Sequence, residues 1–207
     1  MKQIILLSLL FMGTMAVAKA QGGISFWNNH ILGKNKNPSP LHFNADIYPF
    51  LFFAGAGGSI GLEFNHWQVG LIGFSVVPPE FIKNTFFRNA NGVDITQNNA
   101  AEIYLRYYLR KDRKGIFFGL LGGPEWFDMR DKATGASEQL VKSYLVPNFG
   151  FRVFPFKEYF YVDASMGYSF NLSGTEERTL GNTSYRASSG GMIYFFQLGA
   201  RFKLGSK

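Results

Sequence analysis

The chain has 207 residues, a formal net charge of +7 and no cysteine. Aromatic residues make up 17% of it, charged residues another 17%, and there are 24 glycines. This composition is unlike that of a disordered chain or a coiled coil. Without cysteine there is no disulfide framework, thiolate metal site, cysteine nucleophile or lipidated N-terminal cysteine. His30, His42 and His66 leave little for a His-rich metal site, so we expect no metal and no other cofactor.

Residues 1–20 have the features of a secretory signal peptide that is cleaved after export through the inner membrane. Lys2 supplies the positive start, residues 4–17 form the apolar run, and Ala18-Lys19-Ala20 is a small-x-small cleavage site. The apolar run is shorter than the ~20 residues that a membrane-spanning helix needs, and no later stretch is long enough. The mature protein is therefore either soluble and exported, or it crosses a membrane as strands.

Alternation of apolar and polar residues favours the second possibility. In 101–110, Ile103 and Leu105 share one face while Glu102 and Arg106 share the other. The pattern recurs in 59–64, 144–154, 159–170 and 192–204, whereas 67–77 and 116–127 are apolar on both faces and rich in glycine. A soluble sandwich also alternates. Large aromatics on the apolar faces, with Gly, Ser, Tyr and charges of both signs opposite them, favour a transmembrane barrel with a small packed lumen.

The spacing of the connections predicts the topology. Short polar turns lie at Asn65-His66, 111–115 and Lys157-Glu158, and longer connections at 78–98, 128–140 and 171–188. Outer-membrane barrels have short periplasmic turns, long outer loops and an even number of strands. Seven strands follow residue 59, so we place an eighth at 43–53. The apolar face of 43–53 lies at odd positions and that of 59–64 at even positions. The phase of the apolar–polar alternation therefore changes across 54–58.

A Gly-rich tight turn at 54–58 would separate two strands, and a bulge would leave one bent strand. We favour the turn because it makes eight strands. Residues 21–41 then form a periplasmic lead-in, 42–204 the barrel and 205–207 a C-terminal tail, with 23–32 as a rival first strand. The predicted fold is all-β: an eight-stranded antiparallel up-and-down transmembrane β-barrel.

Several stretches resemble the small outer-membrane β-barrel proteins of Bacteroidota. They are 102–109 with 115–119, then 147–156, 161–170 and 198–202, and the likeness covers about 45–204. Residues 197–204 also resemble the C-terminal signal of bacterial outer-membrane barrels, except that Gly205-Ser206-Lys207 follow it. The resemblance implies an outer-membrane location. It implies little about function, because the family shares no catalytic motif.

Charged residues at lumen-facing positions are the main candidate site. The acids are Glu63, Glu102, Glu125 and Asp163, and they face Arg106, Arg110, Arg152, Arg201 and Lys203. An eight-stranded barrel has room for side chains or for one small ligand, and buried charges must pair. We expect a structural ion-pair network that plugs the lumen. The alternative is a gated narrow conduit or a small polar binding site.

The connection 78–98 carries an aromatic cluster, Phe81, Ile82, Phe86 and Phe87. Exposed aromatics can mark a partner surface, so an outer-loop contact is one hypothesis. A loop that folds back over the barrel mouth, or rests in the headgroup layer, is the other. The connection 171–188 has the composition of a solvated, mobile loop.

A lipid-modifying enzyme would need a nucleophile, a base within hydrogen-bond reach and an orienting group. The deacylase barrels carry His followed shortly by Ser and Asn on one strand, and none of the three histidines has that context. We therefore expect no catalytic residue.

The basic charge does not predict nucleic-acid binding. The charges of the three long connections nearly balance, so no outer surface offers a basic stripe. We expect the protein to contact outer-membrane lipids and lipopolysaccharide, to pass through the barrel-assembly machinery during insertion and to meet an unidentified protein partner. We expect no nucleic-acid partner. The predicted function is a non-enzymatic, structural or surface-interaction barrel in a Gram-negative outer membrane. A lipid-modifying enzyme and a narrow channel or small-ligand-binding barrel are the alternatives.

Overall fold

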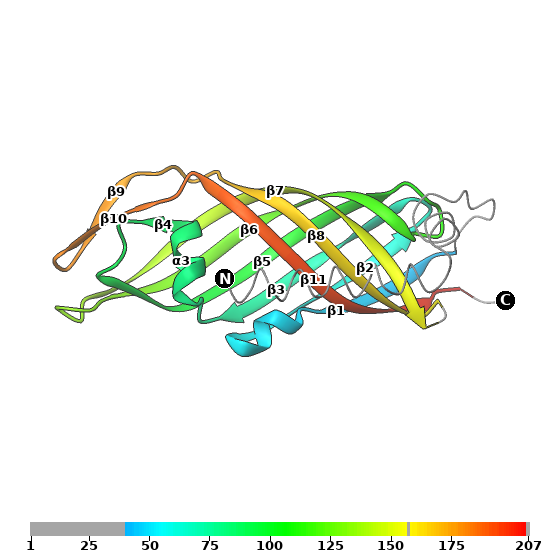
Figure 1. Ribbon diagram of the computed structural model, residues 1–207, viewed down its shortest axis with the longest axis horizontal. Helices are drawn as coiled ribbons and strands as arrows, with labels where there is room; N and C mark the ends of the chain where they lie inside the picture. The colour runs from blue at the N-terminus through cyan, green and yellow to red at the C-terminus, as the bar shows by residue number, and fades with distance from the viewer. Residues whose placement is uncertain (1–39, 157, 206–207) are drawn as a thin grey trace, which may run out of the picture.

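The computed structural model describes residues 40–156 and 158–205, which form a closed antiparallel barrel (Figure 1). Its eight strands are β1 (His42–Ile47), β2 (Gly55–Phe64), β3 (Trp67–Val76), β5 (Val93–Tyr108), β6 (Gly115–Asp131), β7 (Ser137–Phe156), β8 (Phe160–Asn171) and β11 (Gly190–Lys203). Their order around the barrel is β1-β11-β8-β7-β6-β5-β3-β2, an up-and-down path closed by β1. The predicted fold class is confirmed. The predicted signal peptide, the rival strand 23–32 and nearly all of the lead-in lie outside the described residues.

The two ends of the barrel differ in their connections. The turns 65–66 and 109–114 and the short connection between β7 and β8 lie at one end, here called the turn end. The other end, the loop end, carries a 3-10 helix η2 (Pro49–Phe53), a helix α3 (Glu80–Phe86) and three short strands, β4 (Phe87–Arg88), β9 (Glu177–Leu180) and β10 (Thr183–Ala187). The short strands form a second sheet in the order β4-β10-β9, here called the loop-end sheet.

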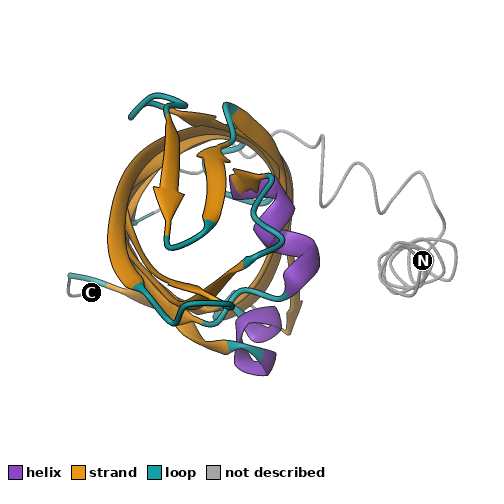
Figure 2. Ribbon diagram, turned by 90° about the vertical axis from the view of Figure 1, so that its left-hand side faces the viewer, coloured by secondary structure: helices purple, strands orange, loops and turns teal. Residues whose placement is uncertain are grey.

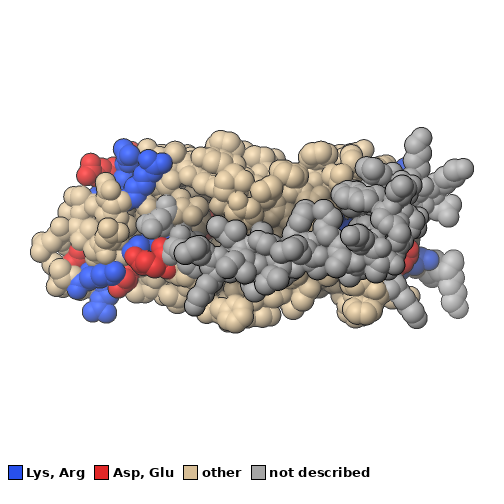
Figure 3. All heavy atoms as spheres, in the orientation of Figure 1, with Lys and Arg blue, Asp and Glu red and all other residues tan. Residues whose placement is uncertain are grey.

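The two-residue period of the strands gives the barrel an apolar outside and a polar inside. Ile60, Leu71 and Ile103 point outward and are more than half exposed, whereas Glu63 and Arg106 point inward and are buried. In Figure 3 charged side chains gather toward the two ends, and the visible surface between them is uncharged. This apolar band is the surface that a transmembrane barrel presents to lipid. Among the described residues no helix is long and apolar enough to cross a bilayer.

The first hairpin corrects the sequence prediction. We expected a strand at 43–53 and a turn at 54–58, but β1 ends at Ile47, the chain reverses through η2, and Gly55 to Gly58 begin β2. Pro49 stands at the start of η2, where its fixed φ suits a helical turn and its missing N–H costs nothing. The phase change therefore occurs at 48–54. Gly57 makes room for this turn, because a Cβ there would lie 2.5 Å from Leu51 Cδ1.

The long connections are more ordered than their composition suggests. Strands β5, β6 and β7 have 16, 17 and 20 residues, more than the about 9–11 that span a bilayer, so their ends project beyond the apolar band. Only 132–136 separate β6 from β7, and 171–188 contains the β9–β10 hairpin. Figure 2 looks into the loop end and shows α3 and the short strands over the opening, with η2 outside the wall.

Glycines on the lumen face lie beside large side chains of neighbouring strands. One row across four neighbouring strands shows this. It runs from Tyr104 on β5 through Gly70 on β3 and Gly61 on β2 to Asn44 on β1. A Cβ on Gly70 would come within 2.7 Å of the Tyr104 ring, and one on Gly61 within 2.4 Å of its hydroxyl. The ring can therefore cross two strands and reach Asn44, whose Nδ2 donates to the hydroxyl at 3.1 Å.

Gly70→Ala should destabilise the barrel by about 1–3 kcal/mol, because the added methyl group overpacks against the backbone oxygen of Ile60 and the Tyr104 ring. Gly73→Ala is the matched control on the same strand, since a Cβ there would meet only Ala100 O at 3.9 Å. Urea unfolding of the detergent-refolded protein, followed by tryptophan fluorescence, measures both. Equal stability of the two variants would contradict the packing described here.

Candidate functional site: the ion-pair network of the lumen

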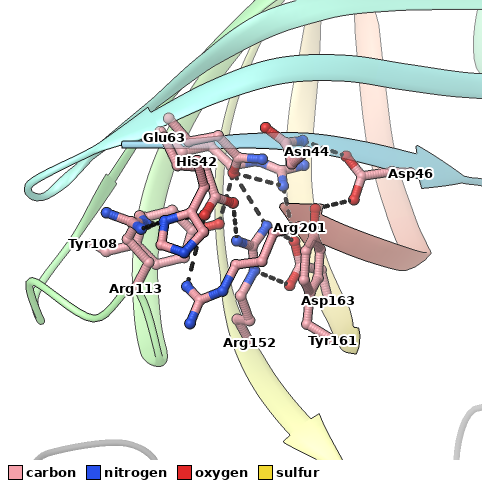
Figure 4. Close-up of polar contacts among 12 residues, drawn as sticks. His42, Asn44, Asp46, Glu63, Tyr108, Arg113, Arg152, Tyr161, Asp163 and Arg201 are labelled. Atoms are coloured by element: carbon pink, nitrogen blue, oxygen red, sulfur yellow. Dashed lines mark hydrogen bonds and ion pairs between the residues drawn. The ribbon is translucent and has the colours of Figure 1, made fainter. Parts of the chain in front are cut away.

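Arg152 occupies the centre of the lumen near the turn end (Figure 4). It lies opposite Asp163 in the β7–β8 pair, and its Nε and Nη2 each donate to a different Asp163 oxygen at 2.7 Å. Its Nη1 donates to Glu63 Oε1 on β2, which is not a neighbour of β7 in the barrel. The side chains of Arg152 and Glu63 are 0% exposed. One guanidinium therefore bridges the interior between separate parts of the wall.

Aromatic rings enclose this guanidinium. The Arg152 Cζ lies 3.6 Å from the centroid of the Tyr161 ring and 4.9 Å from that of Tyr108. A cation over an aromatic face is attracted by the ring quadrupole, and the attraction is larger where water is excluded. The Tyr108 hydroxyl donates to Gln68 Oε1 at 2.7 Å, and Arg152 Nη2 donates to the same oxygen at 3.2 Å.

Two further arginines approach Glu63 from the turn end. Arg113 Nε donates to Glu63 Oε2 at 2.9 Å, and Arg201 Nη1 lies 3.7 Å from the same oxygen. Arg113 belongs to the turn between β5 and β6 and also donates to Asn65 O and to His42 Nδ1. Arg201 donates to the backbone oxygens of Asp112 and Glu158. These contacts join the turns to the buried carboxylate and close this end.

Arg106 and Asp46 extend the network toward the loop end. Arg106 donates to Asp163 Oδ2 at 2.9 Å and to Gln197 Oε1 at 2.7 Å. Asp46 accepts hydrogen bonds from Ser59 at 2.7 Å, from Asn44 at 3.0 Å and from the Tyr161 hydroxyl. The Tyr161 ring reaches Asp46 across Gly199, which lies between them in the strand register.

The structure brings five of the nine candidate lumen residues together. They are Glu63, Asp163, Arg106, Arg152 and Arg201. Glu102 and Glu125 are buried closer to the loop end and make no ion pair with a described residue. Arg110 lies beyond the end of β5 and pairs with Asp112 at 2.7 Å, and Lys203 is exposed at the last position of β11. Strand alternation does not determine side-chain direction where a strand ends, which explains both departures.

Sequence reasoning missed Asp46, Arg113, Gln68 and Gln197. Asp46 and Asn44 stand opposite the apolar face of 43–53, so the alternation itself was the available signal. Gln197 likewise shares a face with Arg201. Arg113 gave no such signal: it lies in a charged turn, and its backbone has a φ of +58°, a conformation that alternation does not predict.

The aromatic cluster of 78–98 does not form an exposed contact surface as a whole. Phe86 and Phe87 are buried in the loop-end mouth, where Phe127 lies 5.5 Å and 5.0 Å from their ring centroids and Tyr144 lies 5.5 Å from that of Phe86. The segment folds back because these rings cover apolar side chains inside the barrel. Phe81 and Ile82 belong to α3, but their side chains lie outside the described part of the structure.

The described histidines have structural contacts. Arg113 donates to His42 at 2.7 Å, while the His66 ring donates to Tyr108 O at 2.8 Å and stacks on Tyr107. Within residues 40–156 and 158–205 neither ring bonds to a serine hydroxyl, so the nucleophile–base pair of acyl hydrolysis is not formed there. His30 lies outside the described residues.

No protein-family model matches the sequence, and no curated protein matches it. Two solved structures are similar in fold. The N-terminal β-barrel domain of Pseudomonas aeruginosa OprF is 15% identical, with a TM-score of 0.43 over 80% of this chain and 98% of that one. Ail of Yersinia pestis, solved with the heparin analogue sucrose octasulfate, is 14% identical, with a TM-score of 0.36 over 79% of this chain and 97% of that one. The fold assignment rests on the strand pairing.

Arg152→Met should lower the free energy of unfolding by about 3–5 kcal/mol, because it leaves Glu63 and Asp163 buried with fewer partners. Lys203→Met is the control, as Lys203 is exposed at the turn end. Equilibrium urea unfolding in detergent measures the difference. A stability equal to that of the wild-type protein would show that Arg152 does not hold the lumen network together.

Proposed function

We propose that this protein is a non-conducting barrel of a Gram-negative outer membrane that acts through the surface of its loop end. The observation that carries the proposal is the Arg152 layer, in which Arg152, Glu63 and Asp163 are buried and bonded across the lumen. A signal peptide at 1–20 and the likeness to Bacteroidota barrels support an exported protein whose turn end faces the periplasm. Among the described residues, no comparable observation supports a channel or an enzyme.

The loop end is built as a fixed surface. Asp131 at the end of β6 accepts hydrogen bonds from the Thr183 hydroxyl and from the hydroxyl and backbone N–H of Thr134, each at 2.7 Å. These donors lower the pKa of Asp131 to about 2, so the carboxylate stays ionised at neutral pH. Ser188 N donates to Phe86 O at 2.7 Å. The β9–β10 hairpin, the β6–β7 turn and the α3 segment are therefore tied to one another.

Exposed arginines on this surface favour an anionic partner. Arg88 and Arg186 lie directly opposite each other in the β4–β10 pair, and both are exposed. Neither forms an ion pair with a described residue. Like charges directly opposite in a sheet are destabilising, whereas two guanidinium groups together suit a phosphate. Lipopolysaccharide phosphates are thus the partner that this surface fits best, and a protein with an acidic patch is the second.

Arg106→Ala should lower the melting temperature without raising conductance in planar bilayers. The expected reason is that Arg106 stabilises Asp163, while Arg152 and Glu63 still block the lumen in its absence. Wild-type protein and Lys203→Ala serve as references. A stable Arg106→Ala protein with a new conductance would support a gated conduit instead.

The double variant Arg88→Gln, Arg186→Gln should bind purified lipopolysaccharide about tenfold more weakly, since each exposed ion pair with a phosphate contributes about 0.2–1 kcal/mol and about 1.4 kcal/mol corresponds to a factor of ten. Binding is measured by surface plasmon resonance at low and high salt. Lys203→Gln, at the turn end, should bind like wild type. Unchanged affinity of the double variant would exclude these arginines from lipopolysaccharide recognition.

A further inference from the structure

Two carboxylates inside the barrel stand apart from the ion-pair network. Glu102 on β5 and Glu125 on β6 are 6% and 4% exposed. Glu125 lies opposite Ala100 in the strand register, so Glu102 is its diagonal neighbour on the same lumen face. Diagonal neighbours in a sheet are within reach of long side chains, and two carboxylates placed so repel each other when both are ionised.

The described residues supply no cation to this pair. Glu102 makes no hydrogen bond or ion pair with a described side chain, and Glu125 accepts one hydrogen bond, from Asn98 Nδ2 at 2.9 Å. Lys142 lies opposite Glu125 in the β6–β7 register. Its Nζ turns away, however, and donates to the backbone oxygens of Ser173 at 3.4 Å and Gly174 at 3.2 Å. Burial of carboxylates without a counter-charge is unfavourable.

Two neutral oxygens beside the pair also lack a partner. Asn98 and Tyr144 are each 2% exposed, and Asn98 Oδ1 and the Tyr144 hydroxyl have no hydrogen-bond partner among the described residues. The bond from Asn98 Nδ2 to Glu125 holds the Asn98 amide beside the carboxylates. Tyr144 lies opposite Gly123, two residues from Glu125 along β6, and interacts electrostatically with Glu125. Buried polar groups without partners are uncommon and point to an additional ligand.

We propose that Glu102, Glu125 and Asn98 bind a hard divalent cation, with Ca²⁺ as the best fit. Two carboxylates balance two positive charges, and Ca²⁺ accepts carboxylate, amide and water oxygens in an irregular shell. The Tyr144 hydroxyl is placed to hydrogen-bond a water of that shell. Mg²⁺ fits less well because it requires near-ideal octahedral geometry.

The site would stabilise the half of the barrel that the arginine network does not reach. It joins β5 to β6 and, through Tyr144, to β7, below the plug formed by Phe86 and Phe87. A cation that binds the folded barrel and not the unfolded chain raises the melting temperature by mass action. Because the plug covers this end of the lumen, the ion should be added during refolding.

The test compares full-length protein refolded in detergent with EDTA, with CaCl₂ or with MgCl₂ at matched ionic strength. Ca²⁺ should raise the melting temperature of the wild-type protein, more than Mg²⁺ does, and elemental analysis of protein refolded with Ca²⁺ and then dialysed should find one Ca²⁺ per chain. Glu102→Gln and Glu125→Gln should each remove the Ca²⁺ shift. In EDTA both should melt at or above the wild-type temperature, because the amide removes an uncompensated charge.

Glu177→Gln is the matched control, since Glu177 is exposed on the loop-end sheet, and it should keep the full Ca²⁺ shift. A wild-type protein that does not respond to Ca²⁺, or Gln variants that keep the shift, would overturn the proposal. Lys142→Met tests whether Lys142, instead of a bound cation, neutralises the two carboxylates. If it melts lower than wild type in EDTA and Ca²⁺ has no effect on either, Lys142 neutralises the pair and the cation site is excluded.

Discussion

The bond between Arg152 and Glu63 is the contact on which the rest of the lumen depends. It joins β7 to β2, two strands that do not pair, so it can form only when the barrel is closed. Both groups are cut off from water, and removal of either would leave the other buried with fewer partners of opposite charge. Asp163, Arg113, Arg106 and Arg201 satisfy the remaining donors and acceptors around them. Barrel closure and charge pairing therefore stabilise each other.

Closure itself depends on the shortest barrel strand. The six residues of β1 pair with both β2 and β11, and two tyrosines hold its inward face from opposite sides. Tyr104 reaches Asn44 across Gly70 and Gly61, and Tyr161 reaches Asp46 across Gly199. Each glycine provides the space that a flat ring needs to cross a strand. These glycines and tyrosines thus have a specific structural role, which composition alone does not reveal.

The interior changes character along its length, and this division shapes the functional proposals. The half near the turn end is filled by paired charges, whereas the half near the loop end is lined by apolar side chains that Phe86 and Phe87 cap. Glu102 and Glu125 lie in that second half and form no ion pair with a residue that the structure describes, which is why they suggest a ligand and the network does not. Above the cap, the loop-end sheet is fixed by Asp131 and exposes Arg88 and Arg186. The proposed contact with a partner therefore belongs to this outer surface.

The sequence by itself determined the number of barrel strands, the position of all but the first and most of the residues that point inward, because a two-residue alternation is local and one face must be apolar in lipid. It identified Glu63, Asp163, Arg106, Arg152 and Arg201 on that ground alone. Only the tertiary structure decided which of these meet, since contact across the lumen depends on register and closure of strands far apart in the chain. The same holds where alternation stops: Arg113 enters the lumen from a turn while Arg110 does not, and the first reversal is made by η2 at Pro49 rather than by the glycines that follow. Backbone direction in those segments is set by packing against other strands, which no local pattern encodes.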